Sequence, residues 1–402
     1  MTNKADFLII GAGILGLSLA RALKLEHPDA SIIILEKENQ IGLHASGRNS
    51  GVLHSGIYYP EKSLKAQLCL EGNRKLAAYC DERKLPISRI GKIILPTKPT
   101  DDAILQMLYQ RATHNGANVK LIDEHELKQI EPAVQTATGQ ALFSPETAVV
   151  DSKAILNHLY HSLIQQGVNI YLNNRCSDIN PKLKTLTTNN KSFAYGHLFN
   201  TAGLYADVIA KACGITDRFT MIPFKGLYFE LSNTSSIPIN HLIYPVPDMN
   251  VPFLGVHFTK STNGRIYVGP TAIPVFGREN YQGLKGANVK DSWETLTALG
   301  RQYYSNKQGF RTYTHQEVAR FIPKNFVAAA QALIPQLTRQ DLKKSAKVGI
   351  RAQLFDRKKG ELVMDFMIKN TENETHVLNA VSPGFTSAFS FSQYIVQSFS
   401  RS

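Results

Sequence analysis

Short apolar runs alternate with helical patterns over the first half of the chain. The run Phe7–Ile10 is wholly apolar, as expected of a strand buried on both faces. Apolar residues then recur at helical spacing from Leu15 to Leu23, and a second β-branched run covers 31–35. This strand–helix–strand order predicts a parallel sheet.

The alternation of strands and helices continues to about residue 215, and the pattern then changes. Further elements of this half are expected as helices at 63–84, within 100–130 and at 151–166, and as strands at 90–95, 168–172 and 197–199. Residues 219–275 carry many aromatic residues, prolines and glycines, which is typical of an antiparallel sheet. Residues 289–342 return to a helical pattern, and strands follow until a last helix from about Gly384.

These patterns predict a fold that combines α/β and α+β parts. A Rossmann-type nucleotide-binding domain is expected to carry an inserted, mainly antiparallel β substrate domain. The predicted ranges are 1–85, 141–215 and 343–402 for the nucleotide-binding domain, and 86–140 and 216–342 for the substrate domain. A length of 402 residues with 43% hydrophobic residues is sufficient for both cores.

The charge balance suggests an anionic partner. The chain has 45 Lys and Arg against 32 Asp and Glu, a net charge of +13. Nucleic acid, a membrane surface or an acidic substrate would each fit this balance. Because the basic residues are scattered and no nucleic-acid-binding signature occurs, we expect no nucleic-acid partner.

The four cysteines indicate a reducing compartment. They lie far apart with no CxxC pair, and no His pair has metal spacing, so no metal site is predicted. The first residues show no signal peptide, and no apolar run is long enough for a transmembrane helix. A cytoplasmic location is therefore expected, with peripheral contact at the inner face of the cell membrane as an extension of it.

A glycine motif follows the first strand directly. Gly11, Gly13 and Gly16 form G-x-G-x-x-G, and the acid Glu36 stands twenty residues later at the end of the second strand. The glycines permit a tight turn beneath a pyrophosphate, and Glu36 suits a ribose. The pattern predicts one bound dinucleotide, disfavours NADP, and leaves FAD and NAD open.

A polar loop from His44 to His54 follows the second strand. Two glycines, two serines, an asparagine and an arginine make it rich in hydrogen-bond donors. Such a loop suits a diphosphate and a flavin edge, although a solvated turn has the same composition.

Seven stretches together resemble one family. They are GAGILG, HASGRNSGVLHSGIYY, FNTAGLYADVIA, IPFKGLYFEL, PFLGVHFT, GIRAQ and SPGFTSA, in this order. The chain resembles the FAD-dependent D-amino-acid oxidase superfamily, and within it the L-2-hydroxyglutarate oxidase/dehydrogenase family, from residue 5 to about 398. The resemblance implies FAD as cofactor. It also implies oxidation of L-2-hydroxyglutarate to 2-oxoglutarate by hydride transfer from C2 to flavin N5, with a quinone or oxygen as electron acceptor.

The resemblance also implies cofactor contacts along the chain. Those at the pyrophosphate and ribose are Gly11, Gly13, Ile14, Gly16, Glu36 and Lys37. Those beside the diphosphate and flavin are Ser46, Arg48, Asn49, Ser50 and Gly51. The remaining contacts are Cys176 by its backbone at adenine, Gly203 near the phosphates, and Gly384, Phe385, Thr386 and Ser387 before the last helix. The bulky Phe385 departs from the small residue that is usual in the family.

For the substrate, the reaction requires a base and cations. His54 is the predicted base, because an unperturbed imidazole titrates near neutrality, and His257 is the second candidate. Arg351 resembles the carboxylate-binding arginine of the superfamily, with Lys225 as a second cation. Either Tyr58 or Tyr59 is expected to line the pocket, and the other one to pack in the core, since successive strand residues face opposite sides.

Two other readings stay open. The superfamily fold also serves amino acids, secondary amines and glycerol 3-phosphate, so the substrate could belong to one of those classes. A basic peripheral membrane or nucleic-acid-binding protein that keeps a dinucleotide only structurally is the non-enzyme alternative.

Overall fold

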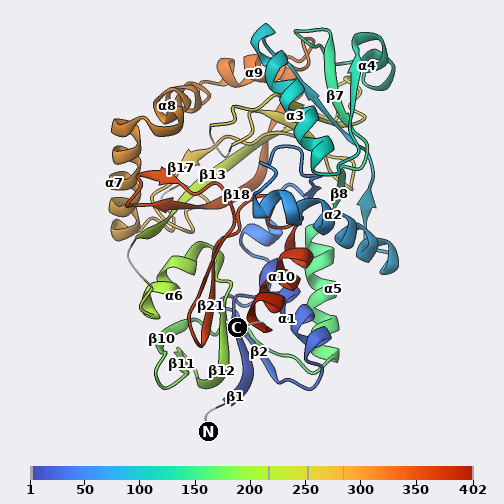
Figure 1. Ribbon diagram of the computed structural model, residues 1–402. Helices are drawn as coiled ribbons and strands as arrows, with labels where there is room; N and C mark the ends of the chain where they lie inside the picture. The colour runs from blue at the N-terminus through green and yellow to red at the C-terminus, as the bar shows by residue number, and fades with distance from the viewer. Residues whose placement is uncertain (1–2, 216–217, 251–252, 284, 401–402) are drawn as a thin grey trace.

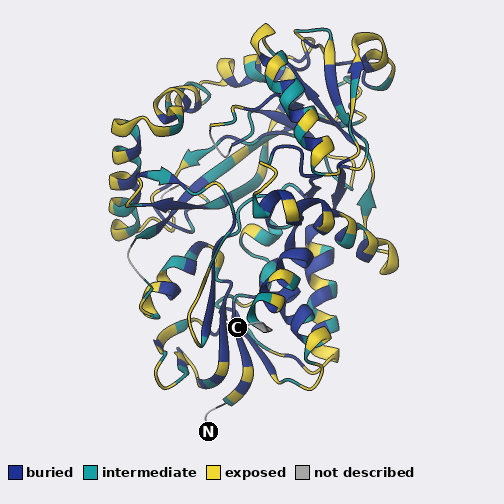
Figure 2. Ribbon diagram, in the orientation of Figure 1, coloured by how far each residue is buried: buried dark blue, intermediate teal, exposed yellow. Residues whose placement is uncertain are grey.

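Two large sheets with helices packed on them make up the fold (Figure 1). The computed structural model describes residues 3–215, 218–250, 253–283 and 285–400. The eight-stranded sheet occupies the lower part of Figure 1 and the ten-stranded sheet the upper part. In Figure 2 the strands of both sheets are mostly buried, whereas the helices expose their outer faces.

The eight-stranded sheet confirms the predicted parallel sheet. Its path is β10-β11-β12-β1-β2-β9, with β21 beside β12 and β20 beside β21. The parallel strands are β1 (Asn3–Ile10), β2 (Ile32–Leu35), β9 (Asn169–Tyr171), β12 (Ser192–Asn200) and β21 (Glu374–Asn379). The antiparallel edge strands are β10 (Cys176–Asn180), β11 (Thr185–Thr188) and β20 (Met367–Asn370).

Apolar helix faces bury one side of this sheet. These helices are α1 (Ile14–Glu26), α2 (Leu64–Glu82), α5 (Ser152–Gln165) and α10 (Ala388–Ser400). The helix α6 (Ala206–Ala212) packs on the other side. The predicted start of α5 is confirmed, since the Asp151 side chain accepts hydrogen bonds from the N–H groups of Lys153 and Ala154. Such a cap satisfies N–H groups that have no partner inside the helix.

The ten-stranded sheet is mainly antiparallel, as predicted. Its order is β19-β18-β13-β16-β15-β14-β5-β7-β6, with β17 beside β13, and β14 and β5 form its parallel pair. The strands are β5 (Lys92–Leu95), β6 (Lys120–Asp123), β7 (Gln140–Ser144), β13 (Phe219–Leu231), β14 (Leu242–Pro245), β15 (His257–Lys260), β16 (Ile266–Gly269), β17 (Ile273–Pro274), β18 (Leu342–Asp356) and β19 (Glu361–Leu362).

Helices cover the outer side of this second part. They are α3 (Asp102–His114), α4 (Glu124–Ile130), α7 (Val289–Ser305), α8 (Phe310–Ala319) and α9 (Pro323–Gln331). Within the range 100–130, strand β6 separates α3 from α4, and a capping box of Asp123 with Glu126 starts α4 directly after it. Three short strands form a small third sheet, namely β3 (Val52–Leu53), β4 (Ile87–Ser88) and β8 (Ala148–Val150).

Strand pairing differs from the predicted domain ranges in two places. Strands β18 and β19 (342–362) belong to the ten-stranded sheet, because β18 pairs along β13, and β7 (140–144) joins the same sheet. The predicted ranges had given both segments to the nucleotide-binding domain. The division into two domains itself stays a prediction. Within the described ranges, no helix has the length and apolarity needed to span a membrane.

Candidate active site

A cavity of about 730 Å³ is lined by residues of both large sheets. Predicted cofactor residues that line it are Gly13, Ile14, Ser46, Arg48, Asn49, Ser50, Gly203, Gly384, Phe385 and Thr386. Predicted substrate residues that line it are His54, His257 and Arg351. The cavity thus brings together the glycine turn, the polar loop and the substrate candidates from distant parts of the sequence.

The glycine turn is held by close backbone approaches. Gly11 has a φ of +102°, and a Cβ on Gly16 would stand 1.9 Å from the Gly11 carbonyl oxygen. Only glycine fits there, as the packing of helix α1 on strand β1 requires. Glu36 accepts hydrogen bonds from the N–H groups of Ala12 (3.0 Å) and Glu38 (3.0 Å), so its carboxylate also fixes the turn. Its contact with ribose stays a prediction.

Asn49 and Ser46 organise the polar loop. The Asn49 amide donates to the Ser46 carbonyl oxygen (2.6 Å) and accepts from the N–H of Gly51 (2.8 Å). Ser46 Oγ accepts from the N–H of Ile14 (3.0 Å), which joins the loop to the start of α1. Gly51 lies behind the cavity wall at a φ of +78°. The loop is therefore ordered by its own side chains rather than solvated.

Lys37 is occupied by an ion-pair cluster. Its ammonium contacts Glu38, Glu279 (2.6 Å) and His44 (3.0 Å), and it does not line the cavity. Within the described ranges, one group of side chains stands close enough together to hold a metal ion, namely Glu38, His44 and Glu279. Because the Lys37 ammonium lies among their ligand atoms, this group is a set of charge-assisted hydrogen bonds.

Cys176 and Ser387 also lie away from the cavity. Cys176 begins the edge strand β10, and its partly buried side chain packs against the core beside the sheet. Burial raises the pKa of its thiol to about 12, so the thiol is not reactive. Ser387 is fully buried before α10, whereas its neighbour Thr386 reaches the site by accepting from the His54 N–H (3.2 Å).

These features fit FAD. The glycine turn, the ordered loop 44–51 and the segment 382–386 form one continuous wall. A Cβ on Gly384 would stand 1.9 Å from the Ala380 carbonyl oxygen, so the chain turns tightly there before α10. Phe385 packs against the core with part of its ring and still lines the cavity, so its bulk is accommodated.

His54 follows strand β3 and lies at the substrate end. The side chain is buried, and its Nδ1 has no hydrogen-bond partner among the described residues. Burial, followed by the charge of Lys92, holds the pKa of His54 well below its usual value. The imidazole is therefore neutral at physiological pH and can accept a proton.

His257 begins strand β15 and stacks on Tyr244. The ring centroids are 3.9 Å apart at an angle of 16°. His257 Nδ1 lies 2.8 Å from the Gly255 carbonyl oxygen, which can only accept, so Nδ1 carries the proton. Burial lowers the pKa of His257 to about 4, which leaves Nε2 as a free acceptor.

Arg351 lies in strand β18 with aromatic side chains around it. Its guanidinium carbon is 5.3 Å from the centre of the Phe253 ring. Burial lowers the pKa of Arg351 from its ordinary value, and the phenol groups of Tyr313, Tyr59 and Tyr228 act in the opposite direction. An arginine stays charged in such a site, so the wall presents a cation to the cavity.

Two predicted substrate residues are not at the cavity. Lys225 pairs with Ile350 across β13 and β18, so it faces away from Arg351, and its ammonium donates to the Asn280 carbonyl oxygen (3.2 Å). Tyr58 is a core residue that does not line the cavity. The roles of Lys225 as a second cation and of Tyr58 in the pocket have no support from this geometry and stay predictions.

Sequence reasoning missed Lys92 and two cations of the wall. Lys92 in strand β5 is fully buried, its ammonium has no partner among the described residues, and it lies 4.6 Å from the centre of the Tyr58 ring. Burial lowers the pKa of Lys92 to about 7. Lys98 and Arg320 line the cavity. The one signal for Lys92 was a lysine that opens the apolar run Lys92–Leu95.

Comparisons with known proteins agree with this site. The family described as FAD dependent oxidoreductase matches residues 6–398. An L-2-hydroxyglutarate dehydrogenase of Indibacter alkaliphilus is 35% identical, and the alignment covers 95% of this chain and 96% of that protein. The L-2-hydroxyglutarate dehydrogenase of Escherichia coli K12 is 33% identical, with 97% and 92% covered.

A solved structure shares the fold. The L-alpha-glycerophosphate oxidase of Mycoplasma pneumoniae, with FAD bound, superposes with a TM-score of 0.77 at 21% identity and covers 98% of this chain and 94% of its own. The cofactor of this chain is FAD, since the family match and the glycine-turn cavity agree. The chain belongs to the FAD-dependent oxidoreductases and, within them, to the L-2-hydroxyglutarate dehydrogenase family.

Proposed function

We propose that this protein oxidises L-2-hydroxyglutarate to 2-oxoglutarate. The observation that carries the proposal is the meeting of a partly buried arginine, Arg351, with two neutral imidazoles, His54 and His257, in one cavity. A 2-hydroxy acid needs a cation for its carboxylate and a base for its hydroxyl proton. The relatives named above supply the particular acid.

Each residue has a separate task in this proposal. Arg351 binds one carboxylate through two parallel hydrogen bonds and so fixes the carbon that is oxidised. Lys98 and Arg320 also line the cavity and supply positive charge for the second carboxylate, although Arg320 is ion-paired with Glu317 as well. FAD, when bound, supplies the two-electron acceptor that the oxidation requires.

One of the two imidazoles takes the hydroxyl proton. Both are neutral because burial lowers their pKa values, so each is ready to accept. The negative charge of a bound dicarboxylate favours the imidazolium that forms. His54 is the preferred base, because its buried Nδ1 has no partner among the described residues. His257 is the second candidate, with Nδ1 bound to the Gly255 carbonyl oxygen and Nε2 as its acceptor.

A substrate panel tests this proposal. Purified holoenzyme is mixed anaerobically with L-2-hydroxyglutarate, D-2-hydroxyglutarate, L-proline, glycine or glycerol 3-phosphate, and flavin bleaching is followed by absorbance. L-2-Hydroxyglutarate is expected to bleach the flavin fastest. Bleaching by an amino acid or by glycerol 3-phosphate, without bleaching by L-2-hydroxyglutarate, would assign the protein to the alternative substrate class.

For the electron acceptor, the outer helices support contact with a membrane quinone pool, although oxygen is the other candidate. Exposed apolar side chains gather on α7 and on the turn between α8 and α9, namely Val289, Trp293, Leu296, Tyr304, Val318, Phe321 and Ile322. Exposed basic residues among them are Lys290, Arg301, Lys307, Arg311 and Lys324. A basic surface with Trp and Tyr fits an anionic lipid surface.

The same surface borders the cavity, since Tyr313 and Glu317 of α8 and Arg320 directly after it line the cavity. The four cysteines are free, in agreement with a cytoplasmic protein at the inner face of the membrane. Pelleting with anionic vesicles at low salt tests the contact. Trp293→Glu is expected to release the protein, whereas Leu25→Glu, an exposed position on α1, leaves it bound. No pelleting at any salt concentration would remove this part of the proposal.

A further inference from the structure

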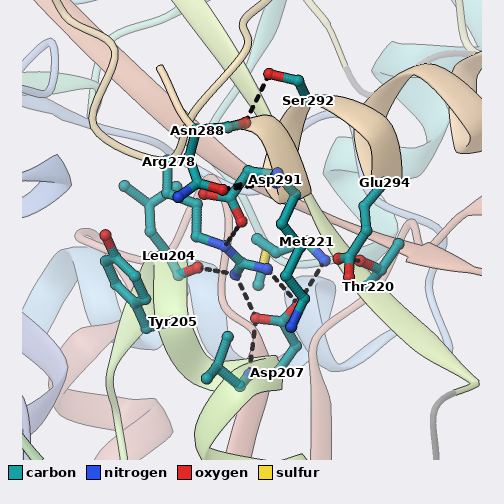
Figure 3. A network of polar contacts seen from close by, with 12 residues as sticks. Leu204, Tyr205, Asp207, Thr220, Met221, Arg278, Asn288, Asp291, Ser292 and Glu294 are labelled. Atoms are coloured by element: carbon teal, nitrogen blue, oxygen red, sulfur yellow. Dashed lines mark hydrogen bonds and ion pairs between the residues drawn. The ribbon is translucent and has the colours of Figure 1, made fainter. Parts of the chain in front are cut away.

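Residues 277–282, which we call the strap, connect the two parts of the molecule. They lie between strand β17 and helix α7 and are anchored by Arg278 (Figure 3). Arg278 donates to Asp207 in α6 (2.5 and 3.0 Å) and to Asp291 in α7 (3.2 Å). Its side chain is only 4% exposed, so the base of the strap is fixed.

Glu279 reaches from this base across the nucleotide crevice. Its Oε1 accepts from Lys37 Nζ (2.6 Å) and from the Tyr205 hydroxyl (2.7 Å). Lys37 follows strand β2, and Tyr205 ends the short 3₁₀ turn Gly203–Tyr205 that follows strand β12. Because β2 and β12 pair with the two sides of β1, one carboxylate joins the loops on both sides of the first glycine turn.

Tyr281 adds a second contact on the polar loop. Its hydroxyl lies 2.8 Å from His44 Nδ1, and its ring centre lies 4.3 Å from the guanidinium carbon of Arg48. Both partners belong to the loop that runs along the cofactor end of the cavity. The strap therefore joins the segments that follow β2 and β12 to the polar loop.

The ion pair between Lys37 and Glu279 is partly buried. The side chains of Lys37 and Glu279 are 17% and 28% exposed. Burial acts to raise the pKa of Glu279, but the hydrogen bonds from Lys37 and Tyr205 outweigh it, so the pKa is lowered. The carboxylate is therefore ionised at neutral pH, and its hydrogen bonds are charge-assisted.

In this fold a dinucleotide binds outside the carboxyl ends of β1 and its neighbours, which is where the strap crosses. We propose that the strap retains the cofactor, with Glu279 and Tyr281 closing the crevice and slowing the release of FAD. They are positioning residues for the loops around FAD. The inference depends on the cofactor and not on the identity of the substrate.

The test measures FAD release without any substrate. Holoenzyme is diluted into buffer without FAD, and the rise in flavin fluorescence gives the dissociation rate constant. Glu279→Gln is expected to release FAD on the order of tenfold faster, and Tyr281→Phe about threefold faster. High salt is expected to bring the wild-type rate toward that of Glu279→Gln, since salt screens the Lys37 ion pair.

Glu361→Gln is the matched control, because Glu361 forms an ion pair with Lys359 (3.6 Å) on strand β19. Its release rate should match that of the wild type. The melting temperature of each apoprotein separates an effect on FAD retention from an effect on folding. If Glu279→Gln does not fold, Tyr281→Phe remains as the test, because it removes only one hydroxyl group. Release rates equal to the wild type in folded Glu279→Gln and Tyr281→Phe would overturn the proposal, and so would a lower melting temperature with unchanged release.

Discussion

The two ends of the cavity are built in different ways. At the cofactor end, backbone groups and small residues shape the wall, as at Gly11, Gly13 and Gly16. At the substrate end, ionisable side chains line the cavity, among them the buried His54 and the partly buried Arg351. In the proposed function, the first end binds a shared cofactor by shape, and the second binds one substrate by charge.

This difference has a physical consequence. A backbone cradle tolerates a range of pH values, because peptide groups do not titrate. Buried imidazoles and cations change charge with pH and with the ligand that is bound. Changes at the substrate end should therefore alter kinetics while FAD remains bound, and changes at the cofactor end should alter FAD binding first.

The largest effect is expected at His54. His54→Ala should lower the rate of anaerobic flavin reduction by roughly 10²–10⁴-fold, as the loss of a general base does. The visible spectrum should show unchanged FAD content. His158→Ala, on helix α5 and hydrogen-bonded to Tyr79, is the control and should keep the wild-type rate. A His54→Ala protein without flavin would place His54 at the cofactor end instead.

The pH profile of the wild type gives a related prediction. A base works when it is unprotonated, and burial lowers the pKa of His54 below its ordinary value of 6.5. Activity in kcat/KM should therefore stay flat as the pH falls through 6.5 and decline only at lower pH. A decline with a midpoint at or above 6.5 would exclude a buried imidazole as the base.

A smaller effect is expected at Arg351. Arg351→Lys should raise KM and lower kcat/KM by roughly a hundredfold, or about 3 kcal/mol, because an ammonium cannot make the two parallel hydrogen bonds. FAD should stay bound. Lys225→Met, on the opposite face of the same strand pair, should leave KM unchanged when FAD is saturating. Equal KM values for Arg351→Lys and wild type would make Arg351 a structural residue.

At the cofactor end, Gly13→Ala tests the backbone cradle. A Cβ on Gly13 would stand 2.9 Å from Ser46 Oγ and displace the hydrogen bond between Ser46 and the N–H of Ile14. We expect roughly tenfold weaker FAD binding by fluorescence titration of the apoprotein. Once FAD is saturating, the KM for substrate should be that of the wild type. A changed KM would mean that the two ends are coupled.

The smallest effect concerns Lys92. Lys92→Met should stabilise the protein at pH 7 by about 1–3 kcal/mol in chemical denaturation, because it removes an ammonium that has no partner among the described residues. Burial lowers the pKa of Lys92 from 10.5 in the unfolded chain to about 7 in the folded one. Between these values the unfolded chain binds more protons, so wild-type stability should rise with pH. If the unfolding free energy of Lys92→Met rose with pH as steeply as that of the wild type, the result would contradict this assignment.

The cofactor end was predictable because its signals are local. The glycine turn, the polar loop and the Asp151 cap each depend on residues within a few positions of one another. The substrate end depends on which strands pair. Whether Lys225 or Arg351 faces the cavity follows from the register of β13 on β18, and one residue of shift reverses the answer.

The features that could not be predicted from the sequence depend on contacts between residues far apart in the chain. Lys37 was expected at a ribose, but Glu279 binds it from far along the chain. Lys92 looked like part of a core strand, and only the packing of β5 beside Tyr58 and Tyr244 shows an unpartnered charge there. The predicted domain ranges separate β18 from β13, its partner in the ten-stranded sheet, because more than a hundred residues lie between the two strands.

An anaerobic titration tests the central claim most directly. Wild-type holoenzyme is titrated with L-2-hydroxyglutarate while flavin absorbance and 2-oxoglutarate are both measured. We expect one equivalent of substrate to bleach one equivalent of flavin and to yield one equivalent of 2-oxoglutarate, with D-2-hydroxyglutarate inactive. An unbleached flavin at saturating L-2-hydroxyglutarate, or bleaching without 2-oxoglutarate, would contradict the proposed function.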